Sequence, residues 1–322
     1  MLIRRRALLT ASAAATIASP ALAQNYPRKA VQLIVAFPAG GSTDVGARIL
    51  AAAAEKDLGQ PITVVNKGGA GGQLGFTEIA RARPDGYTLG FLNLPGLNTI
   101  ILDPERKAAF NIDSFIPIVN QVLDPGLIWV KGDSPYKTLA DLIDAAKKAP
   151  GKISACTTGI LSDDHLAILM VQEAAKCEFR IVHFDGGAQQ LTGVMGGHVD
   201  CAFDNVGSVF KRVLSGEVRG LAVTDVERSK FLPNVPCTKE LGMATVISSS
   251  TRGVGAPKGM PADVIKVVET AFLKAIESPE MKQKMDAVGL ALKPMVGATY
   301  AKYYADTQAL SKKYTEWALK QR

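Results

Sequence analysis

A strand followed by a glycine bend and a helix begins at Val31, and units of this kind recur along the chain. Residues 31–36 form a short apolar run rich in β-branched side chains, which predicts a buried parallel strand that ends before Gly40 and Gly41. From Thr43 onward the apolar residues follow helical spacing, and Ser42 or Thr43 can cap the first turn. Glycines before a helix N-terminus leave its first N–H groups and the positive end of its dipole accessible. The bend can therefore bind an anion.

A purely structural role for this bend is the alternative, because many strand–glycine–helix turns in α/β proteins bind nothing. Asp44 lies in the predicted first turn, where its carboxylate would complement the helix dipole and repel a ligand anion placed close to it. Asp44 can instead face an amine, a hydroxyl or a water on the ligand.

The order of strand, small polar loop and helix start recurs several times, which predicts an α/β fold. Strand-like runs followed by such loops lie at residues 62–65, 88–92, 153–157, 180–184 and 199–203. In an open sheet such loops share one edge, where ligands bind. Asn93, at the end of one of these runs, is therefore a further candidate site residue.

The chain is predicted to leave its first domain and later return to it, which indicates two lobes. Residues 116–122 and 127–130 read as separate strands with a break at residues 124–126, and residues 246–254 read as a returning strand. Such crossings predict a hinge and a cleft between the lobes. We expect residues 24–124 and 246–322 in lobe 1 and residues 125–245 in lobe 2.

The first 23 residues read as a signal peptide. Arg4-Arg5-Arg6 is a basic start, residues 7–17 are a mild apolar run, and Ala21-Leu22-Ala23 is a small-x-small cleavage site. We expect export to the periplasm by the twin-arginine or the general secretory route, with a mature chain that begins at Gln24 and is soluble.

Composition and spacing exclude several classes of function. The chain has 37 basic and 30 acidic residues, and no basic tract has interleaved aromatic residues, so we expect no nucleic-acid partner. The glycines at residues 69–75 are spaced one residue wider than in a dinucleotide-binding loop, and no acidic residue follows at the required distance. We therefore expect no nucleotide cofactor.

Four cysteines remain in the mature chain, at positions 156, 177, 201 and 237. An exported protein can pair them in one or two disulfides, and buried free thiols are an equal alternative. No Cys-x-x-Cys or His-x-x-x-His spacing occurs, so we expect no metal site.

Several motifs follow one another along the chain in an order typical of one family. They are Tyr26-Pro27, residues 37–44 with Arg48, residues 58–61, 66–72 and 84–89, and later residues 221–224, Arg228, residues 232–236 and residues 241–242. In these motifs the chain resembles the Bug-type extracytoplasmic solute receptors of tripartite tricarboxylate transporters.

The resemblance implies a type II periplasmic-binding-protein fold, a two-lobed Venus flytrap whose lobes are α/β sandwiches with mixed, mainly parallel sheets. It also implies a small carboxylate ligand, membrane subunits of a transporter as partners, and a monomer.

By the same resemblance, one ligand-binding wall matches the first glycine bend and the other matches loops of the second lobe. The motif at residues 184–187 is more similar to the tricarboxylate receptors than to the amino-acid receptors. The residues that the resemblance places at the ligand are Phe37, Ala39, Gly40, Gly41, Ser42, Thr43, Asp44, Gly159, Ser162, His165, Gly186, Gly187, Asp204, Asn205 and Ser208.

The chain departs from the family pattern at two places. Residues 159–162 read Gly-Ile-Leu-Ser where many relatives have a Gly-Ser pair before the helix. Thr251-Arg252 stands in the returning strand where many relatives have an aromatic residue. Our hypothesis is that the planar fork of Arg252 pairs with a second ligand carboxylate, and the alternative is a solvated hinge residue.

An enzyme is the competing class, because Ser162, Asp164 and His165 are the residue types of a hydrolytic triad. The chain has no Gly-x-Ser-x-Gly elbow, and a serine and a histidine three residues apart at one helix start would align poorly as nucleophile and base. We therefore expect a receptor without catalytic activity. A receptor that presents its ligand to a sensor kinase stays open, as does the ligand itself: dicarboxylate, tricarboxylate, aromatic acid or amino acid.

Overall fold

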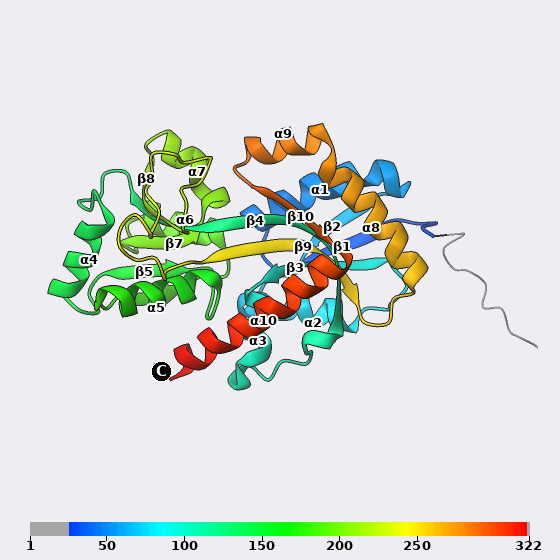
Figure 1. Ribbon diagram of the computed structural model, residues 1–322, viewed down its shortest axis with the longest axis horizontal. Coiled ribbons are helices and arrows are strands. Elements are labelled where there is room, and N and C mark those ends of the chain that lie inside the picture. Colours follow the sequence, from blue (N-terminus) through cyan, green and yellow to red (C-terminus); the bar gives the residue numbers. More distant parts are fainter. Residues whose placement is uncertain (1–25, 321–322) are drawn as a thin grey trace, which may run out of the picture.

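The structure is a computed structural model that describes residues 26–320, so the predicted signal peptide lies outside the described residues. Figure 1 shows two α/β lobes joined by long strands, with the helix α10 lying along both. The strands shared by the lobes are β4 (Phe115–Lys131) and β9 (Ser249–Pro257), and α10 covers Gly297–Leu319.

Lobe 1 contains the start of the chain and most of its end. Its strands are β1 (Val31–Val35), β2 (Ile62–Asn66), β3 (Thr88–Leu94) and β10 (Leu292–Val296). Its α-helices are α1 (Ser42–Leu58), α2 (Gln73–Arg81), α3 (Gly96–Leu102), α8 (Ala262–Glu277) and α9 (Pro279–Ala287), and three 3-10 turns lie at Ala70–Gly72, Pro104–Arg106 and Ile112–Ser114.

Lobe 2 is built from the middle of the chain. Its strands are β5 (Ser154–Thr157), β6 (Arg180–His183), β7 (Cys201–Asn205) and β8 (Val218–Thr224). Its helices are α4 (Leu139–Lys148), α5 (Asp163–Ala175), α6 (Gly187–Met195) and α7 (Val206–Leu214).

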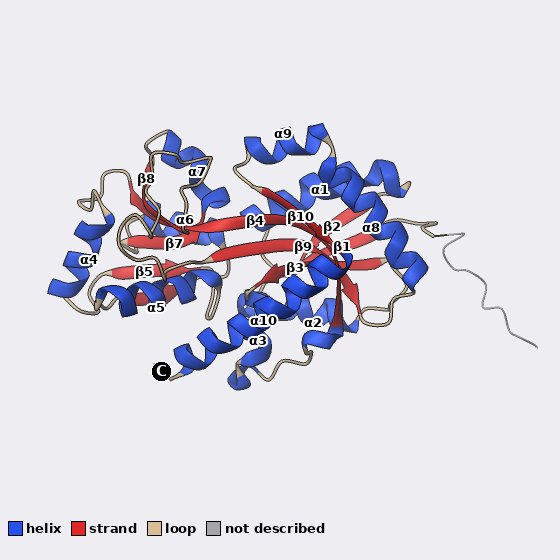
Figure 2. Cartoon of the chain, in the orientation of Figure 1, coloured by secondary structure: helices blue, strands red, loops and turns tan. Residues whose placement is uncertain are grey.

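Each lobe is a mixed sheet with helices on both faces (Figure 2). The strand order is β2-β1-β3-β9-β4 in lobe 1 and β4-β7-β5-β6 in lobe 2, with β10 and β8 also paired to β4. Strands β1 and β5 pair in parallel with both neighbours, whereas β4 and β9 pair antiparallel with theirs. Because the parallel strands run toward the other lobe, the loops after them face the space between the lobes.

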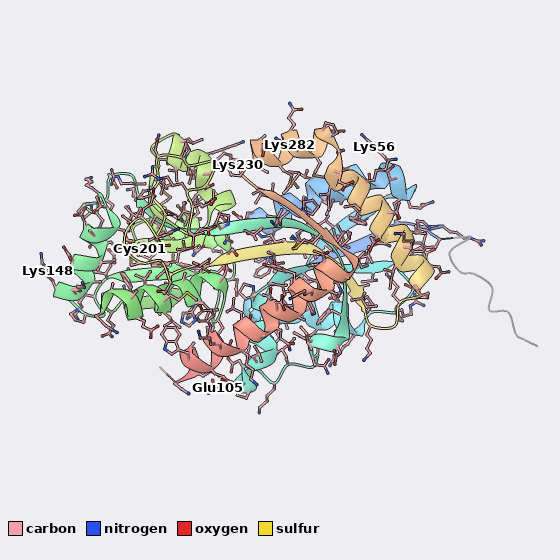
Figure 3. The ribbon with its side chains drawn as sticks, viewed as in Figure 1. Lys56, Glu105, Lys148, Cys201, Lys230 and Lys282 are labelled. Carbon is pink, nitrogen blue, oxygen red and sulfur yellow. The ribbon has the colours of Figure 1, made fainter. Side chains whose placement is uncertain are left out.

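Apolar side chains fill both faces of each sheet. In lobe 1 one core holds Leu50 of α1 and Phe272 of α8, and the core on the opposite face holds Phe76 of α2. In lobe 2 one core holds Ile168 of α5, and the opposite core holds Phe210 of α7. Figure 3 shows side chains filling the interior of both lobes, among them the labelled Cys201 in a core of lobe 2. Two separate sets of cores explain why the chain forms two lobes.

Strand β4 runs through both lobes without a break, so the predicted interruption at residues 124–126 is wrong. Its first part, Phe115 to Pro125, pairs with β9, and from Gly126 onward it pairs with β7 and β8. The ring of Pro125 is compatible with extended backbone, and the N–H of Gly126 donates to Ser248 O at 2.9 Å. Proline and glycine, which are typical of turns, therefore occur here at the point where a continuous strand changes the strands with which it pairs.

The C-terminal helix contacts both lobes, whereas the division made from the sequence assigns it to lobe 1 alone. Tyr304 near the start of α10 packs into a core of lobe 1, and Ala318 near its end is buried in a core of lobe 2. The returning strand begins at Ser249 rather than at residue 246. The sequence analysis also missed β10 and α3, which are short and lack a clear periodic pattern.

The four cysteines are thiols in this structure, three of them buried and Cys177 half-buried. Within residues 26–320, none of the helices combines the length and the apolar character needed to cross a membrane.

We predict that Gly253→Ala destabilises the protein, because an added Cβ would lie 2.5 Å from Val119 O and 2.6 Å from Asn120 Cα, both on the adjacent β4 backbone. The free energy of unfolding in urea should fall by about 1–3 kcal/mol. The exposed Lys258 directly follows β9, so Lys258→Ala is a control that should stay within about 0.5 kcal/mol of the wild type. An unchanged stability of Gly253→Ala would show that β9 can move away from β4.

Candidate functional site

A small polar cleft of about 60 Å³ lies between the lobes, so it can hold a small molecule or a few waters. The lobe 1 and hinge residues that line it are Phe37, Pro38, Ala39, Gly41, Ser42, Thr43, Gly71, Asn93, Gly96, Ser250 and Arg252. The lobe 2 residues that line it are Thr158, Gly159, Ile160, Ser162, Asp163, Gly186, Gly187, Ala188, Gln189, Asp204, Asn205 and Ser208.

Five of the described helices begin at this cleft. Helices α1 and α3 start in lobe 1, and α5, α6 and α7 start opposite them in lobe 2. Ser162 caps α5 by accepting a hydrogen bond from the N–H of His165, and the N–H of Gly207 in the first turn of α7 donates to Asp124 Oδ1 at 3.0 Å. The residues before α1 and α6 form no side-chain capping bond, so the first-turn N–H groups and the positive dipole ends of these two helices favour an anionic group in the cleft.

Asp44 and Gly40 lie outside the cleft, which corrects their prediction as ligand contacts. The Asp44 side chain is buried, accepts hydrogen bonds from the N–H of Gly40 at 3.0 Å and from Asn66 Nδ2 at 2.9 Å, and forms an ion pair with Arg48 at 3.0 Å. Burial acts to raise the pKa of Asp44, but the hydrogen bonds from Arg48, Gly40 and Asn66 outweigh it and lower the pKa. Asp44 therefore holds the glycine bend from behind as a carboxylate.

His165 also lies outside the cleft, in a groove on the outer side of the loop that precedes α5. Its Nδ1 accepts a hydrogen bond from the N–H of Leu161 at 2.9 Å, and its ring packs edge-on against His183 with the ring centres 4.8 Å apart. Leu161 has a positive φ of 60°, so this bond supports a strained loop. The predicted role of His165 as a ligand contact is therefore corrected to support of the loop.

The remaining predicted site residues line the cleft, and the sequence analysis missed several of their neighbours. Most of the missed residues are adjacent in sequence to predicted ones, so extending each predicted loop by one residue would have found them. Gly71 and Ser250 had no such signal, because the fold alone brings their loops to the cleft. The missed residues are Pro38, Gly71, Gly96, Thr158, Ile160, Asp163, Ala188, Gln189 and Ser250.

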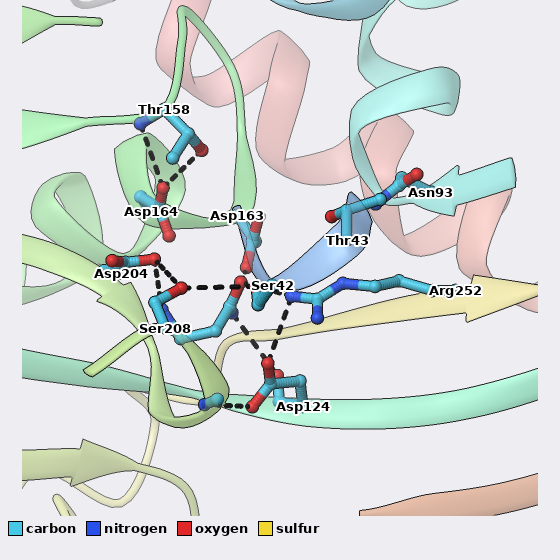
Figure 4. A network of polar contacts seen from close by, with 12 residues as sticks. Ser42, Thr43, Asn93, Asp124, Thr158, Asp163, Asp164, Asp204, Ser208 and Arg252 are labelled. Carbon is cyan, nitrogen blue, oxygen red and sulfur yellow. Dashed lines mark hydrogen bonds and ion pairs between the residues drawn. The ribbon is translucent and has the colours of Figure 1, made fainter. Parts of the chain in front are cut away.

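A buried ion pair joins the two crossing strands at the cleft (Figure 4). Arg252 of β9 is 2% exposed, and its Nη2 lies 3.1 Å from Asp124 Oδ2 of β4 and donates to Asn205 Oδ1 at 2.9 Å. The alternative of a solvated hinge residue is therefore wrong. The Nε and Nη1 atoms of Arg252 are enclosed and have no hydrogen-bond partner in the structure.

Three further buried carboxyl groups surround this pair, and burial raises the pKa of each. Asp204 accepts hydrogen bonds from Ser208 and from the N–H of Asn205, yet burial raises its pKa to about 7. Burial also raises the pKa of Asp124 to about 6 in spite of the Arg252 charge, and raises those of Asp163 and Asp164. The lobe 2 wall is thus rich in carboxyl groups, and some of these groups are partly protonated near neutral pH.

The lobes touch across the cleft, so the structure shows a closed arrangement. Figure 4 shows Ser42 of α1 facing Ser208 of α7. The polar contacts between the lobes include Ser42 Oγ to Ser208 Oγ at 3.2 Å, Thr99 Oγ1 to Leu161 O at 2.8 Å, Arg106 Nη2 to Ile160 O at 3.0 Å, and Lys230 Nζ to Asp286 Oδ1 at 2.7 Å.

Ser162 and His165 do not have the arrangement of a nucleophile and its base. The Ser162 hydroxyl caps α5, and the Nδ1 lone pair of His165 is used by the N–H of Leu161. A neutral imidazole that accepts at Nδ1 carries its proton on Nε2, which then cannot accept a proton from a serine. No group of three or more His, Cys, Asp or Glu side chains within residues 26–320 is arranged to hold a metal ion.

The family model described as the tripartite tricarboxylate transporter family receptor matches residues 46–317. The protein BugT of Bordetella pertussis is 31% identical over 278 residues, which cover 86% of this chain and 85% of BugT. A solved structure of the periplasmic binding protein BugD has a TM-score of 0.82 and 29% identity, with 92% of this chain and 98% of BugD covered. A structure of R. palustris Rpa4515 with adipate has a TM-score of 0.83 and 25% identity, with 90% and 97% covered.

We predict that the buried carboxyl groups make the folded protein less stable as the pH rises from about 5 to about 7. The pKa of Asp204 in the folded protein lies above the value of about 3.9 for an unfolded Asp, so in this range the folded state binds more protons than the unfolded state. The melting temperature should therefore fall with rising pH, and the fall should be smaller in Asp204→Asn. The exposed Asp133 is the control, and Asp133→Asn should keep the wild-type slope. Equal slopes for Asp204→Asn and the wild type would contradict the raised pKa.

Proposed function

Because the chain belongs to the receptor family of the tripartite tricarboxylate transporters, we propose that it binds a small carboxylate between its lobes and delivers it to the membrane subunits of such a transporter. The observation that carries the proposal is the convergence of the uncapped starts of α1 and α6 on one cleft between the closed lobes. The likeness to the periplasmic protein BugD supports the periplasm as the place of function. We propose that the receptor acts as a monomer.

One ligand carboxylate lies at the start of α1. The backbone N–H groups of Ser42 and Thr43 have no capping side chain there, and the Ser42 and Thr43 hydroxyls line the same space. Asp44 keeps the bend in place from behind without facing the cleft. Donors of this kind recognise a carboxylate and leave the rest of the ligand to the side chains opposite.

A second ligand carboxylate pairs with Arg252. Its guanidinium lies in the cleft wall, and two of its N–H donors, Nε and Nη1, lack partners in the closed structure. Buried donors of this kind are costly when unpaired, so a ligand acceptor that reaches them gains the bonds that the protein leaves unmade. The adipate in the Rpa4515 structure is a dicarboxylate, which supports a ligand with two carboxylates for this chain as well.

Ligand binding shifts the equilibrium from open to closed lobes. A ligand that contacts α1 in lobe 1 and α6 or α7 in lobe 2 makes both sets of contacts only when the lobes are closed. The hydrogen bonds between the lobes, such as Thr99 to Leu161 and Ser42 to Ser208, then further stabilise the closed state. The transporter recognises this closed form.

We predict that a dicarboxylate stabilises the mature protein against heat, and that Arg252 contributes to its affinity. Succinate at 100 times its dissociation constant should add about 2.7 kcal/mol to the free energy of unfolding, while the neutral diamide succinamide should add nothing. Arg252→Gln should weaken dicarboxylate binding by roughly 10-fold or more, since it removes a charged donor.

Two control variants separate binding from folding in this experiment. Arg252→Gln leaves Asp124 buried without its ion pair, so the double variant Asp124→Asn with Arg252→Gln tests binding in a protein without that unpaired charge. Arg83 is largely exposed, and Arg83→Gln should bind like the wild type. Wild-type affinity in the folded double variant would show that Arg252 does not contribute to dicarboxylate binding. In cells, loss of carboxylate uptake on deletion would support transport, whereas loss of ligand-dependent transcription alone would indicate the sensor role.

A further inference from the structure

Asp204 leaves one carboxylate oxygen without a partner in the wall of the cleft. The residue ends β7 next to Asn205 and is 2% exposed. Its Oδ1 accepts two hydrogen bonds, from the N–H of Asn205 at 2.7 Å and from Ser208 Oγ at 2.8 Å. Its Oδ2 is enclosed and accepts none from the protein.

A glycine at the start of α6 lies beside the enclosed Asp204 Oδ2. Gly187, the first residue of α6, also lines the cleft, and a Cβ added there would lie 3.7 Å from Asp204 Oδ2 and 3.6 Å from Ser208 Oγ. No side chain of residue 187 therefore stands between Oδ2 and the cleft. A ligand group can occupy that space.

The nearby hydroxyl groups cannot supply the missing donor. Ser208 gives its proton to Asp204 Oδ1, so at 3.2 Å it accepts the proton of Ser42. The Asn205 side chain donates to Asp163 Oδ2 at 2.8 Å and accepts from Arg252. Figure 4 shows Ser208 between Asp204 and Ser42, with its bonds to both drawn as dashed lines.

The charged side chains of the cleft also indicate that Asp204 needs a donor from the ligand. The charged side chains that line it are Asp163, Asp204 and Arg252, and Asp124 lies behind them in contact with Arg252. Asp163 has Asn205 as its donor, so Asp204 is the lining carboxyl group with an unused oxygen. A ligand with acceptors alone would satisfy Arg252 and leave Oδ2 of the deprotonated Asp204 without a donor.

We propose that the ligand is a carboxylate that also carries a hydrogen-bond donor, a hydroxyl or an ammonium group, directed at Asp204 Oδ2. This inference rests on the proposed carboxylate-receptor function and narrows its ligand class to hydroxy or amino carboxylates. The Asn205 side chain accepts from Arg252 and its backbone N–H donates to Asp204 Oδ1, so the cation and this carboxyl group belong to one hydrogen-bond network.

The test measures ligand preference with matched acids that differ by one donor group. Titration calorimetry on the mature protein compares succinate with malate and aspartate, propionate with lactate, and tricarballylate with citrate. In each set that binds, the donor-bearing acid should bind at least about 10-fold more tightly than the bare acid. The malate and aspartate arms distinguish a hydroxyl donor from an ammonium donor.

Asp204→Asn turns the same position from an acceptor into a donor. The amide oxygen of the new residue would keep the two bonds that Oδ1 accepts, which places its NH₂ group where Oδ2 lies now. The preference for the donor-bearing acid should disappear, while the bare acid should bind at least as well as to the wild type. A merely structural role would weaken both members of a pair equally. The exposed Asp133→Asn variant should keep the wild-type preference.

Three outcomes are decisive. A wild-type preference that disappears in Asp204→Asn supports the inference. Equal wild-type affinities within each set, or a preference that Asp204→Asn retains, overturns it and leaves the carboxylate receptor standing. Absence of binding by all of these acids overturns the proposed function together with the inference.

Discussion

The ion pair between Arg252 and Asp124 is the interaction on which the site depends. It joins β9 to β4, the two strands that cross between the lobes, and Arg252 also reaches Asn205 at the start of α7. A buried ion pair adds little net stability, because desolvation offsets much of the attraction between the charges. Its value here lies in position, because it holds a cation at the hinge side of a wall whose other charged side chains are the carboxyl groups of Asp163 and Asp204.

The backbone and the side chains of the cleft have different roles in the proposed ligand recognition. The starts of α1 and α6 have N–H groups without a capping side chain, which suit any carboxylate, and this part of the site follows from the order of the elements. Arg252 and Asp204 each keep buried hydrogen-bonding capacity that the protein does not use, and on this we base our proposal that they distinguish among carboxylates. The family resemblance therefore predicts the receptor, whereas our proposal for the ligand class rests on side chains of the cleft wall.

Sequence reasoning located the loops of the site better than it located individual side chains. It placed Phe37 to Thr43 and Asp204 to Ser208 at the cleft because each of these loops follows a strand, and of the residues predicted there only Gly40 does not line the cleft. It misplaced Asp44 and His165, because polar residues at a helix start can turn either toward a ligand or toward their own loop. Both turn inward, Asp44 to the N–H of Gly40 and the His165 ring to the N–H of Leu161.

The sequence by itself determined the local units: strands from β-branched runs, bends from paired glycines, and helix starts from polar caps, together with the family. The tertiary structure decided what no local pattern contains. It made β4 continuous across Asp124 to Gly126, because the strand changes partners there between the two lobes. It also buried Arg252 among carboxyl groups that are far away in sequence. Such contacts join segments that are far apart in the sequence and form only in the folded chain, and therefore no short stretch of sequence encodes them.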